Sequence, residues 1–344
     1  MLNIYEDKQI NFDEFINLGK KIGVLLNENL IMKKIFDNNY GIFAKNNINP
    51  QKKLISIPKK LLISYDTIKN LILSEEVDYP NLEFLKLYFN SIPNFQYFRK
   101  NYLIFHEEQT KSEIFSFFID HSPTKKKLEN YFMDFHKFDD LDKYLFLIFR
   151  SRAFNIRGSS FLVPILDMAN YKFGSLRSVT NESEVYYKNE NILQINEEFF
   201  QGYGVNNDIV SFYLHYNFIP DAFNNISIPP NFFSLNISDN NRDKLSYDYW
   251  NVKDGKCSNK SFIVFDNLRA PFEFNLEINK ILSDSTKVSK FKMRVLELLK
   301  NEIKIESVKN FLNKESSNNK IYNFVKALEI NYIKISEAIK NLDN

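Results

Sequence analysis

The segment from residue 150 to residue 171, RSRAFNIRGSSFLVPILDMANY, constrains the fold of this chain more than any other. Helix-like residues come first, a polar bend from Asn155 to Ser160 follows, and the apolar run FLVPIL then ends at Asp167 and Asn170. Polar groups at the end of a buried element must bond to each other, to backbone or to a ligand. Taken alone, the pattern is typical of a core strand with a polar cap at its carboxyl end.

Length and composition narrow the classes of protein that the chain can belong to. With 344 residues it can bury a sizeable core, as two domains or as one with a large insertion. The 45 Lys and Arg residues nearly balance 43 Asp and Glu residues, which gives no argument for nucleic acid or a membrane as partner. The single Cys257 and the spacing of the four histidines predict neither a disulfide framework nor a metal site. No signal peptide or membrane-spanning run is visible, so we expect a soluble, cytoplasmic protein, with the nucleus as the alternative.

The first 63 residues read as a short helix followed by strands. NFDEFINL (11–18) predicts an amphipathic helix that Asn11 caps and that is broken at Gly19 and Gly23. The runs LIMKKIF (30–36), IFAKNNI (42–48) and LISIP (54–58) predict a meander of short strands that Pro58 closes.

From about residue 64 to residue 153 the apolar spacing predicts packed helices. The clearest is DDLDKYLFLIFRSRAF, for which Asp139 or Asp140 is the expected cap. Arg152 continues the buried stripe of that helix, so it must be paired or must await a partner, because an isolated buried charge costs several kcal/mol. Farther on, residues 185–200 predict a hairpin, Asp208 is the expected cap of another helix, SFIVFDN (261–267) resembles a strand, and helices follow to the end. Strands, a helical insert, more strands and a helical tail make an α+β chain.

Four elements occur in a fixed order: YGIFAKNNINPQKKLISIP (40–58), SRAF (151–154), LVPILDMAN (162–170), and GYG, whose Tyr203 precedes Tyr216 of YNF by 13 residues. This order resembles the SET-domain methyltransferases, specifically the split-SET branch typified by the Rubisco large-subunit lysine methyltransferase. The resemblance covers nearly the whole chain. It implies a SET-domain β-fold of short strands with a pseudoknot, split by a helical insert and followed by an α-helical domain. The implied parts are an N-terminal SET half (1–63), the insert (64–150), a C-terminal SET half with the catalytic motifs (151–220) and a mainly helical, substrate-binding-like domain (221–344).

The activity that the resemblance implies is methyl transfer from S-adenosylmethionine to a protein lysine, which needs no metal. A lysine amine must be neutral to attack, and burial in an apolar aromatic channel lowers its ordinary pKa of about 10.4. Tyr203 matches the family's catalytic tyrosine. The matching cofactor-binding positions are Asn38, Asn39, Tyr40, Arg152, Asn170 and Tyr171, and the matching substrate positions are Phe154, Asp167 and Tyr216. Structural alternatives stay open: a core tyrosine for Tyr203, packing for Phe154 and Tyr216, and an ion pair for Arg152.

The chain also departs from the family pattern. Tyr171 stands where the family has histidine, Asn39 replaces the leading glycine, the glutamate after the catalytic tyrosine is absent from NNDIVSFYL, and YGF has become YNF. A non-catalytic SET scaffold that binds a partner is therefore the alternative to a lysine methyltransferase. Histidine methylation is a further alternative that Phe154 and Tyr216 disfavour, because the histidine-modifying branch has smaller residues there. We expect a non-histone protein substrate, a monomer, and no nucleic-acid or membrane partner.

Overall fold

The computed structural model describes residues 2–102 except 7, 9, 37 and 38, and residues 135–202 except 136, 173, 174, 176 and 177. Beyond these it describes short segments only, at 216, 226–228, 234–236, 250–253, 256–259, 262–264, 305–314, 322, 325–330, 332–333 and 337. The chain forms two compact units. The first contains residues 1–105 and 135–204, and the second contains residues 106–134 and 205–344.

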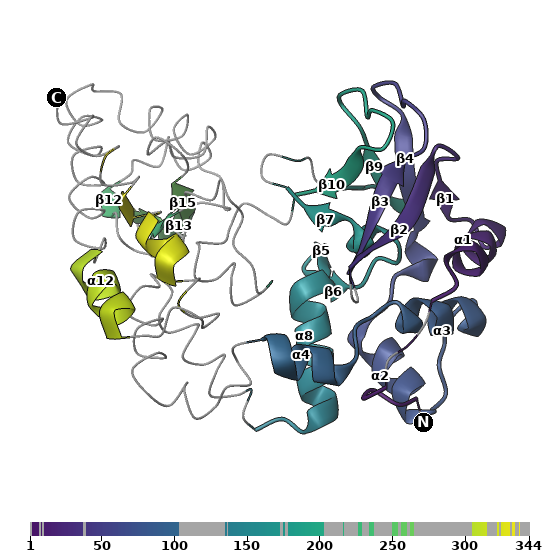
Figure 1. Ribbon diagram of the computed structural model, residues 1–344, viewed down its shortest axis with the longest axis horizontal. Coiled ribbons are helices and arrows are strands. Elements are labelled where there is room, and N and C mark those ends of the chain that lie inside the picture. The colour runs from purple at the N-terminus through teal and green to yellow at the C-terminus, as the bar shows by residue number, and fades with distance from the viewer. Residues whose placement is uncertain are drawn as a thin grey trace. The chain divides into compact units, whose positions relative to one another are not determined.

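Figure 1 shows the helices of the first unit. They begin where side chains can cap them. Side chains of Asn11, Ser64, Asn81 and Asp139 each accept a hydrogen bond from a first-turn N–H. Asn94 caps a further helix in the same way. These five helices are α1 (Phe12–Lys21), α2 (Tyr65–Leu73), α3 (Leu82–Asn90), α4 (Phe95–Asn101) and α8 (Asp140–Arg152). These positions confirm the caps expected at 11 and 139.

Helix α1 is not broken at Gly19, so that part of the expectation is wrong, but it does end before Gly23. The helix continues to Lys21, because the missing side chain at Gly19 admits a neighbour rather than breaking the helix. A Cβ at residue 19 would lie 3.1 Å from the ring of Phe84, on α3. Phe84 also stacks on Phe15, with ring centroids 4.8 Å apart. Gly19 is therefore a packing residue between α1 and α3.

Two four-stranded sheets each join strands from before and after the helical segment. One has the order β1-β4-β9-β8 and the other β2-β3-β10-β7. All pairs are antiparallel except β10–β7, which is parallel. The strands are β1 (Leu25–Leu26), β2 (Leu30–Phe36), β3 (Asn39–Ala44), β4 (Lys53–Pro58), β7 (Asn170–Tyr171), β8 (Val179–Thr180), β9 (Glu184–Lys188) and β10 (Glu198–Gln201). Segments far apart in the sequence therefore meet within each sheet.

The hairpin expected at residues 185–200 is wrong. β9 pairs with β4 and β8, whereas β10 pairs with β3 and β7, so the chain crosses from one sheet to the other between them. Asn189 holds the start of this crossing, because its side chain accepts from Lys52 N at 3.0 Å and donates to Asn49 O at 2.8 Å. The two strands still touch, since the rings of Tyr187 and Phe199 meet edge to face at 4.5 Å.

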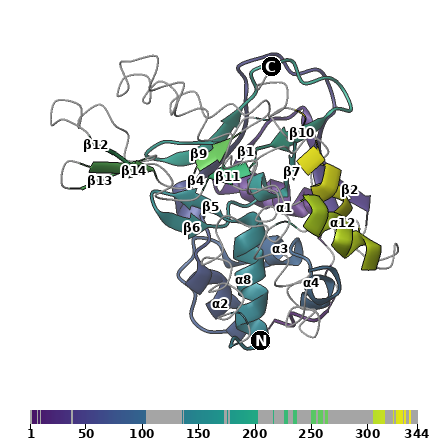
Figure 2. The same cartoon turned by 90° about the vertical axis from the view of Figure 1, so that its left-hand side faces the viewer.

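The helical core of the first unit is aromatic and centres on α8. Tyr144 is wholly buried, and its ring packs edge-on against Phe89, Phe95 and Phe98 of α3 and α4. Its hydroxyl donates to Pro93 O at 2.9 Å, which satisfies the polar atom that burial would otherwise strand. Figure 2 shows α8 beside α2 and α4. This packing fixes the carboxyl end of α8, where Arg152 lies. Residues 103–134, where the sequence predicts further helices, fall outside the described residues.

The described part of the second unit contains strands as well as helices. β11 (Ile226–Ile228) pairs with β15 (Phe262–Val264), and β14 (Lys256–Asn259) lies between β12 (Ser234–Asn236) and β13 (Trp250–Lys253). The strand expected within SFIVFDN is β15, whereas sequence spacing did not reveal the other four. Helix α12 (Ile305–Lys314) and the helical residues 325–330 belong to the expected helical tail. The four-part division of the chain stays a prediction.

Candidate functional site

Three neighbouring strands of the second sheet bring residues 40, 170 and 198 together. Asn170, on β7, donates through Nδ2 to Tyr40 O of β3 at 3.0 Å and to Glu198 Oε1 of β10 at 2.6 Å. The strand order β3-β10-β7 and the registers Phe43↔Glu198 and Phe200↔Asn170 create this convergence. Two of the predicted cofactor positions, Tyr40 and Asn170, are thus in direct contact although 130 residues separate them.

Gly41 makes room for this arrangement. A Cβ at residue 41 would lie 2.5 Å from Glu198 Oε1, 2.8 Å from Ile35 Cδ1 and 2.9 Å from the Phe43 ring. Atoms that close must shift, so the glycine is required by close approach. Partial burial raises the pKa of Glu198, and the hydrogen bond from Asn170 opposes that rise. The result is a half-buried carboxylate held by an amide.

A second cluster, the inner trio of Arg152, Asp167 and Tyr88, lies where α8, α3 and the 3-10 helix η3 (Leu166–Met168) meet. The Tyr88 hydroxyl donates to Asp167 Oδ2. Arg152 Nη1 lies 3.9 Å from the same Oδ2 and donates to Asp167 O at 3.4 Å. The Asp167 side chain is 0% exposed and that of Arg152 is 17% exposed. Arg152 therefore has the ion-pair partner that its place on the buried stripe of α8 demanded.

Burial dominates the electrostatics of the inner trio. It raises the pKa of Asp167 to about 6, against the lowering effects of Arg152, of the Tyr88 hydroxyl and of a backbone hydrogen bond. Burial also raises the pKa of Tyr88 well above its ordinary value, so this phenol stays a donor. Asp167 Oδ1 has no hydrogen-bond partner among the described residues. The carboxylate is thus only partly satisfied, which is why its charged form is costly.

The backbone just before Asp167 is strained. Ile165 has φ 70° and ψ −50°, close to a γ-turn that β-branched residues rarely adopt. Such a conformation costs on the order of 1–3 kcal/mol and persists only where the surroundings enforce it. Leu162 supplies part of that enforcement, because it exchanges two backbone hydrogen bonds with Ile63 at 2.9 and 3.1 Å. The side chain of Ile165 is itself fully buried. The strain lets the chain turn from the core segment into η3 and β7.

Arg152 of the inner trio acts electrostatically on the Tyr40 phenol. Burial raises the pKa of the Tyr40 phenol, and the positive charge of Arg152 lowers it in part. The predicted cofactor positions Tyr40, Arg152 and Asn170 therefore belong to one neighbourhood. Tyr171 follows Asn170 on β7, pairs in register with Gln201 and is half-buried.

Phe154 begins the hairpin that replaces the expected polar bend. β5 (Phe154–Ile156) and β6 (Ser159–Phe161) are antiparallel, and Phe154 pairs with Phe161. Arg157 and Gly158, at the turn, have φ 53° and 87°, the signature of a tight two-residue hairpin turn. The side chain of Phe154 is half-buried one residue beyond the Ala153 cap of α8.

The remaining predicted positions are described in part or not at all. Tyr203, the predicted catalytic tyrosine, and Asn38 lie outside the described residues. Asn39 begins β3 and pairs with Phe36, so its backbone is described and its side chain is not. Tyr216 is helical and half-buried, and it belongs to the second unit. The roles assigned to these residues stay predictions.

Sequence reasoning missed three residues that the structure brings to the site. Tyr88 lies on the apolar stripe of α3 and reads as core, which gives no sign of its bond to Asp167. Glu198 alternates with Phe199 along β10, and that alternation was the only available signal. Gln201 is 4% exposed, and its Oε1 has no hydrogen-bond partner in the part of the chain that is described.

The described residues contain no group of three or more His, Cys, Asp or Glu side chains placed to hold a metal ion. Within the same residues, no helix combines the length and the apolar composition needed to cross a membrane.

Each of the two sheets combines strands that precede the helical segment with strands that follow it, and the short parallel strand β7 carries Asn170. This is the arrangement of a SET domain. The solved structures that the chain resembles are SET domains of LSMT. One is bound to lysine and AdoHcy, with 15% sequence identity and a TM-score of 0.52 over 96% of this chain and 91% of that chain. Another is bound to MeLysine and AdoHcy, with 15% identity and a TM-score of 0.51 over 97% of this chain and 92% of that chain. No protein-family model and no curated protein sequence matches the chain. The expected SET-domain fold is confirmed.

Proposed function

We propose that this chain is an S-adenosylmethionine-dependent protein-lysine N-methyltransferase that acts on a non-histone protein. The observation that carries the proposal is the contact of Asn170 with Tyr40 and Glu198 across β7, β3 and β10. It assembles two predicted cofactor positions in a SET-domain fold. The LSMT structures bound to AdoHcy with lysine or MeLysine support the same cofactor and substrate class.

The donor and acceptor set around Asn170 fits the amino-acid end of the cofactor. Tyr40 O and Glu198 Oε1 accept from Asn170 Nδ2, and the amide oxygen of Asn170 is the acceptor suited to an ammonium group. Gly41 leaves the space that the Glu198 carboxylate occupies beside Asn170. S-adenosylmethionine supplies the methyl group when bound, and the chain has to align the lysine amine with it.

The substrate amine must lose its proton before transfer, so its surroundings must disfavour the ammonium form. A desolvated aromatic channel does so, and Phe154 and Tyr203 of the first unit are proposed to line it. The proposed role of the Tyr203 hydroxyl is to stabilise the charge that moves during transfer.

A labelling experiment tests the proposal. The purified chain is incubated with radiolabelled S-adenosylmethionine and a proteome extract, and the labelled residue is identified by mass spectrometry. We expect label on a lysine of a non-histone protein. Tyr203→Phe should reduce the label by roughly 10²-fold, the effect of one lost electrostatic group, while it leaves cofactor binding intact. Label on histidine would reassign the substrate, and no cofactor binding in calorimetry would favour a non-catalytic scaffold.

A further inference from the structure

The carboxylate of Glu198 fixes the orientation of the Asn170 side chain. Both hydrogen-bond partners of Asn170 Nδ2, Tyr40 O at 3.0 Å and Glu198 Oε1 at 2.6 Å, can only accept while Glu198 is ionised. An amide turned the other way would set oxygen against two acceptors. The nitrogen must therefore face β3 and β10, and the amide presents Oδ1 in the other direction.

The position of Glu198 is itself built into the sheet. Its Oε1 occupies the space that a Cβ at residue 41 would require, at 2.5 Å. Glu198 forms no ion pair with any residue that the structure describes, and partial burial raises its pKa. A carboxylate that is desolvated without a cation is unfavourable for stability alone. Among the described residues, its one side-chain hydrogen-bond partner is the amide of Asn170.

We propose that Glu198 is a positioning residue for cofactor binding, which holds Asn170 so that its Oδ1 accepts from the α-ammonium group of S-adenosylmethionine. The inference rests on the proposed function and specifies how that cofactor site is held. Glu198 acts through Asn170, so its removal affects only ligands that carry the amino-acid end.

Two ligands separate this role from a structural one. S-adenosylhomocysteine has the amino-acid end, and 5′-methylthioadenosine shares its adenosine and thioether but lacks that end. In calorimetry, Glu198→Gln should weaken S-adenosylhomocysteine binding about tenfold, because a neutral amide that can donate as well as accept no longer fixes which way the Asn170 amide faces. Its affinity for 5′-methylthioadenosine should change less than about twofold.

Glu197→Gln is the matched control. Glu197 is the neighbouring residue, its side chain is exposed, and its Oε2 accepts from Gln194 N at 2.8 Å, away from Asn170. This variant should bind both ligands as the wild type does. Glu198→Asp, whose shorter carboxylate cannot reach Asn170 in the same way, should repeat the selective loss and serves if Glu198→Gln fails to fold.

Three outcomes decide the inference. Selective loss of S-adenosylhomocysteine affinity supports it. Unchanged affinity, or an equal loss for both ligands, overturns it while the proposed function stands. A wild-type chain that binds neither ligand rejects the proposed function and the inference with it.

Discussion

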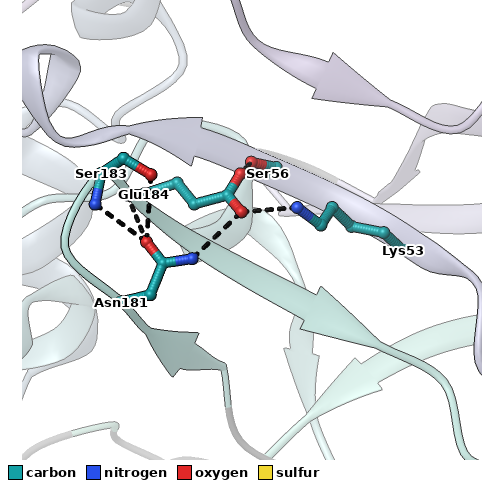
Figure 3. A network of polar contacts seen from close by, with 5 residues as sticks. All are labelled: Lys53, Ser56, Asn181, Ser183 and Glu184. Carbon is teal, nitrogen blue, oxygen red and sulfur yellow. Dashed lines mark hydrogen bonds and ion pairs between the residues drawn. The ribbon is translucent and has the colours of Figure 1, made fainter.

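Two of the trios of cation, carboxylate and hydroxyl in the first unit differ in burial. The inner trio lies where α3, α8 and η3 meet. The outer trio of Lys53, Glu184 and Ser56 lies on β4 and β9, where Figure 3 shows Glu184 between the other two and Asn181. Lys53 Nζ is 2.5 Å from Glu184 Oε1, and Ser56 Oγ donates to Glu184 Oε2. The exposed fractions of the Lys53 and Glu184 side chains are 34% and 21%, against 17% and 0% in the inner pair.

The same chemistry gives opposite pKa shifts in the two trios. Hydrogen bonds from Lys53 and then Ser56 lower the pKa of Glu184, because little desolvation opposes them. Desolvation instead raises the pKa of Asp167 to about 6, although a cation and a phenol stand beside it. Burial, and not the choice of partners, therefore decides whether the charged carboxylate is favoured. In the inner trio the ionised form of Asp167 is disfavoured by burial. A carboxylate with such a perturbed pKa is more typical of a functional site than of an ion pair that stabilises the fold.

The largest expected effect comes from removing the inner cation. Arg152→Met leaves Asp167 buried beside Tyr88 alone, and loss of one partner of a buried pair costs about 3–4 kcal/mol of unfolding free energy. Urea denaturation at pH 7.5 measures it. Arg152→Lys retains the charge and should lose much less. A loss below about 1 kcal/mol would show that the pair contributes little.

The second-largest expected effect is on the pH dependence of stability, which should distinguish Asp167 from Glu184. The folded pKa of Asp167, about 6, lies above the ordinary value of about 3.9, so the folded state binds more protons between these values. Its contribution to stability is therefore present at low pH and is lost as the pH rises through 6. The stability of Asp167→Asn relative to the wild type should rise by about 2 kcal/mol from pH 4.5 to pH 7.5. A difference that is flat with pH would place the folded pKa near its ordinary value.

The two hydroxyls provide a matched pair of smaller changes. Tyr88→Phe removes a fully buried donor to Asp167 and should cost about 1.5 kcal/mol at pH 7.5. It should also raise the pKa of Asp167 further, because that hydrogen bond lowers it. Ser56→Ala removes the corresponding donor to Glu184 and should cost about 0.5–1 kcal/mol. Equal losses in denaturation would contradict the claim that burial separates the trios.

Local rules predicted the elements better than their partners. The caps at Asn11 and Asp139 and the strands at 30–36 and 54–58 follow from residues adjacent in sequence, and these expectations are confirmed. The hairpin at 185–200 failed because strand pairing depends on distant residues, here β4 and β3. No local pattern shows that a chain will cross between two sheets.

The predictions about the site divide in the same way, into residues that local motifs identify and residues that depend on distant contacts. Motif order brought Tyr40, Asn170 and Arg152 to attention, and the structure places them in one neighbourhood. Tyr88 and Glu198 escaped, because their roles depend on which side chain meets them across a helix or strand contact. An apolar stripe on a helix and an alternating pattern on a strand predict which side chains are buried. They do not predict which residue a buried side chain bonds to.

The smallest expected effect lies in the outer trio. Lys53→Met removes a partly exposed ion pair, and such pairs contribute about 0.5 kcal/mol because solvent screens them. The lowered folded pKa of Glu184 means that its contribution is present at neutral pH and is lost as the pH falls below about 4.3, the ordinary value for glutamate. This direction is opposite to that of Asp167. Chemical denaturation of Lys53→Met at pH 7.5, in low salt and in 1 M salt, should show the small loss in low salt only. A loss as large as that of Arg152→Met would mean that the outer pair is shielded from water as well as the inner one, and burial would no longer explain their difference.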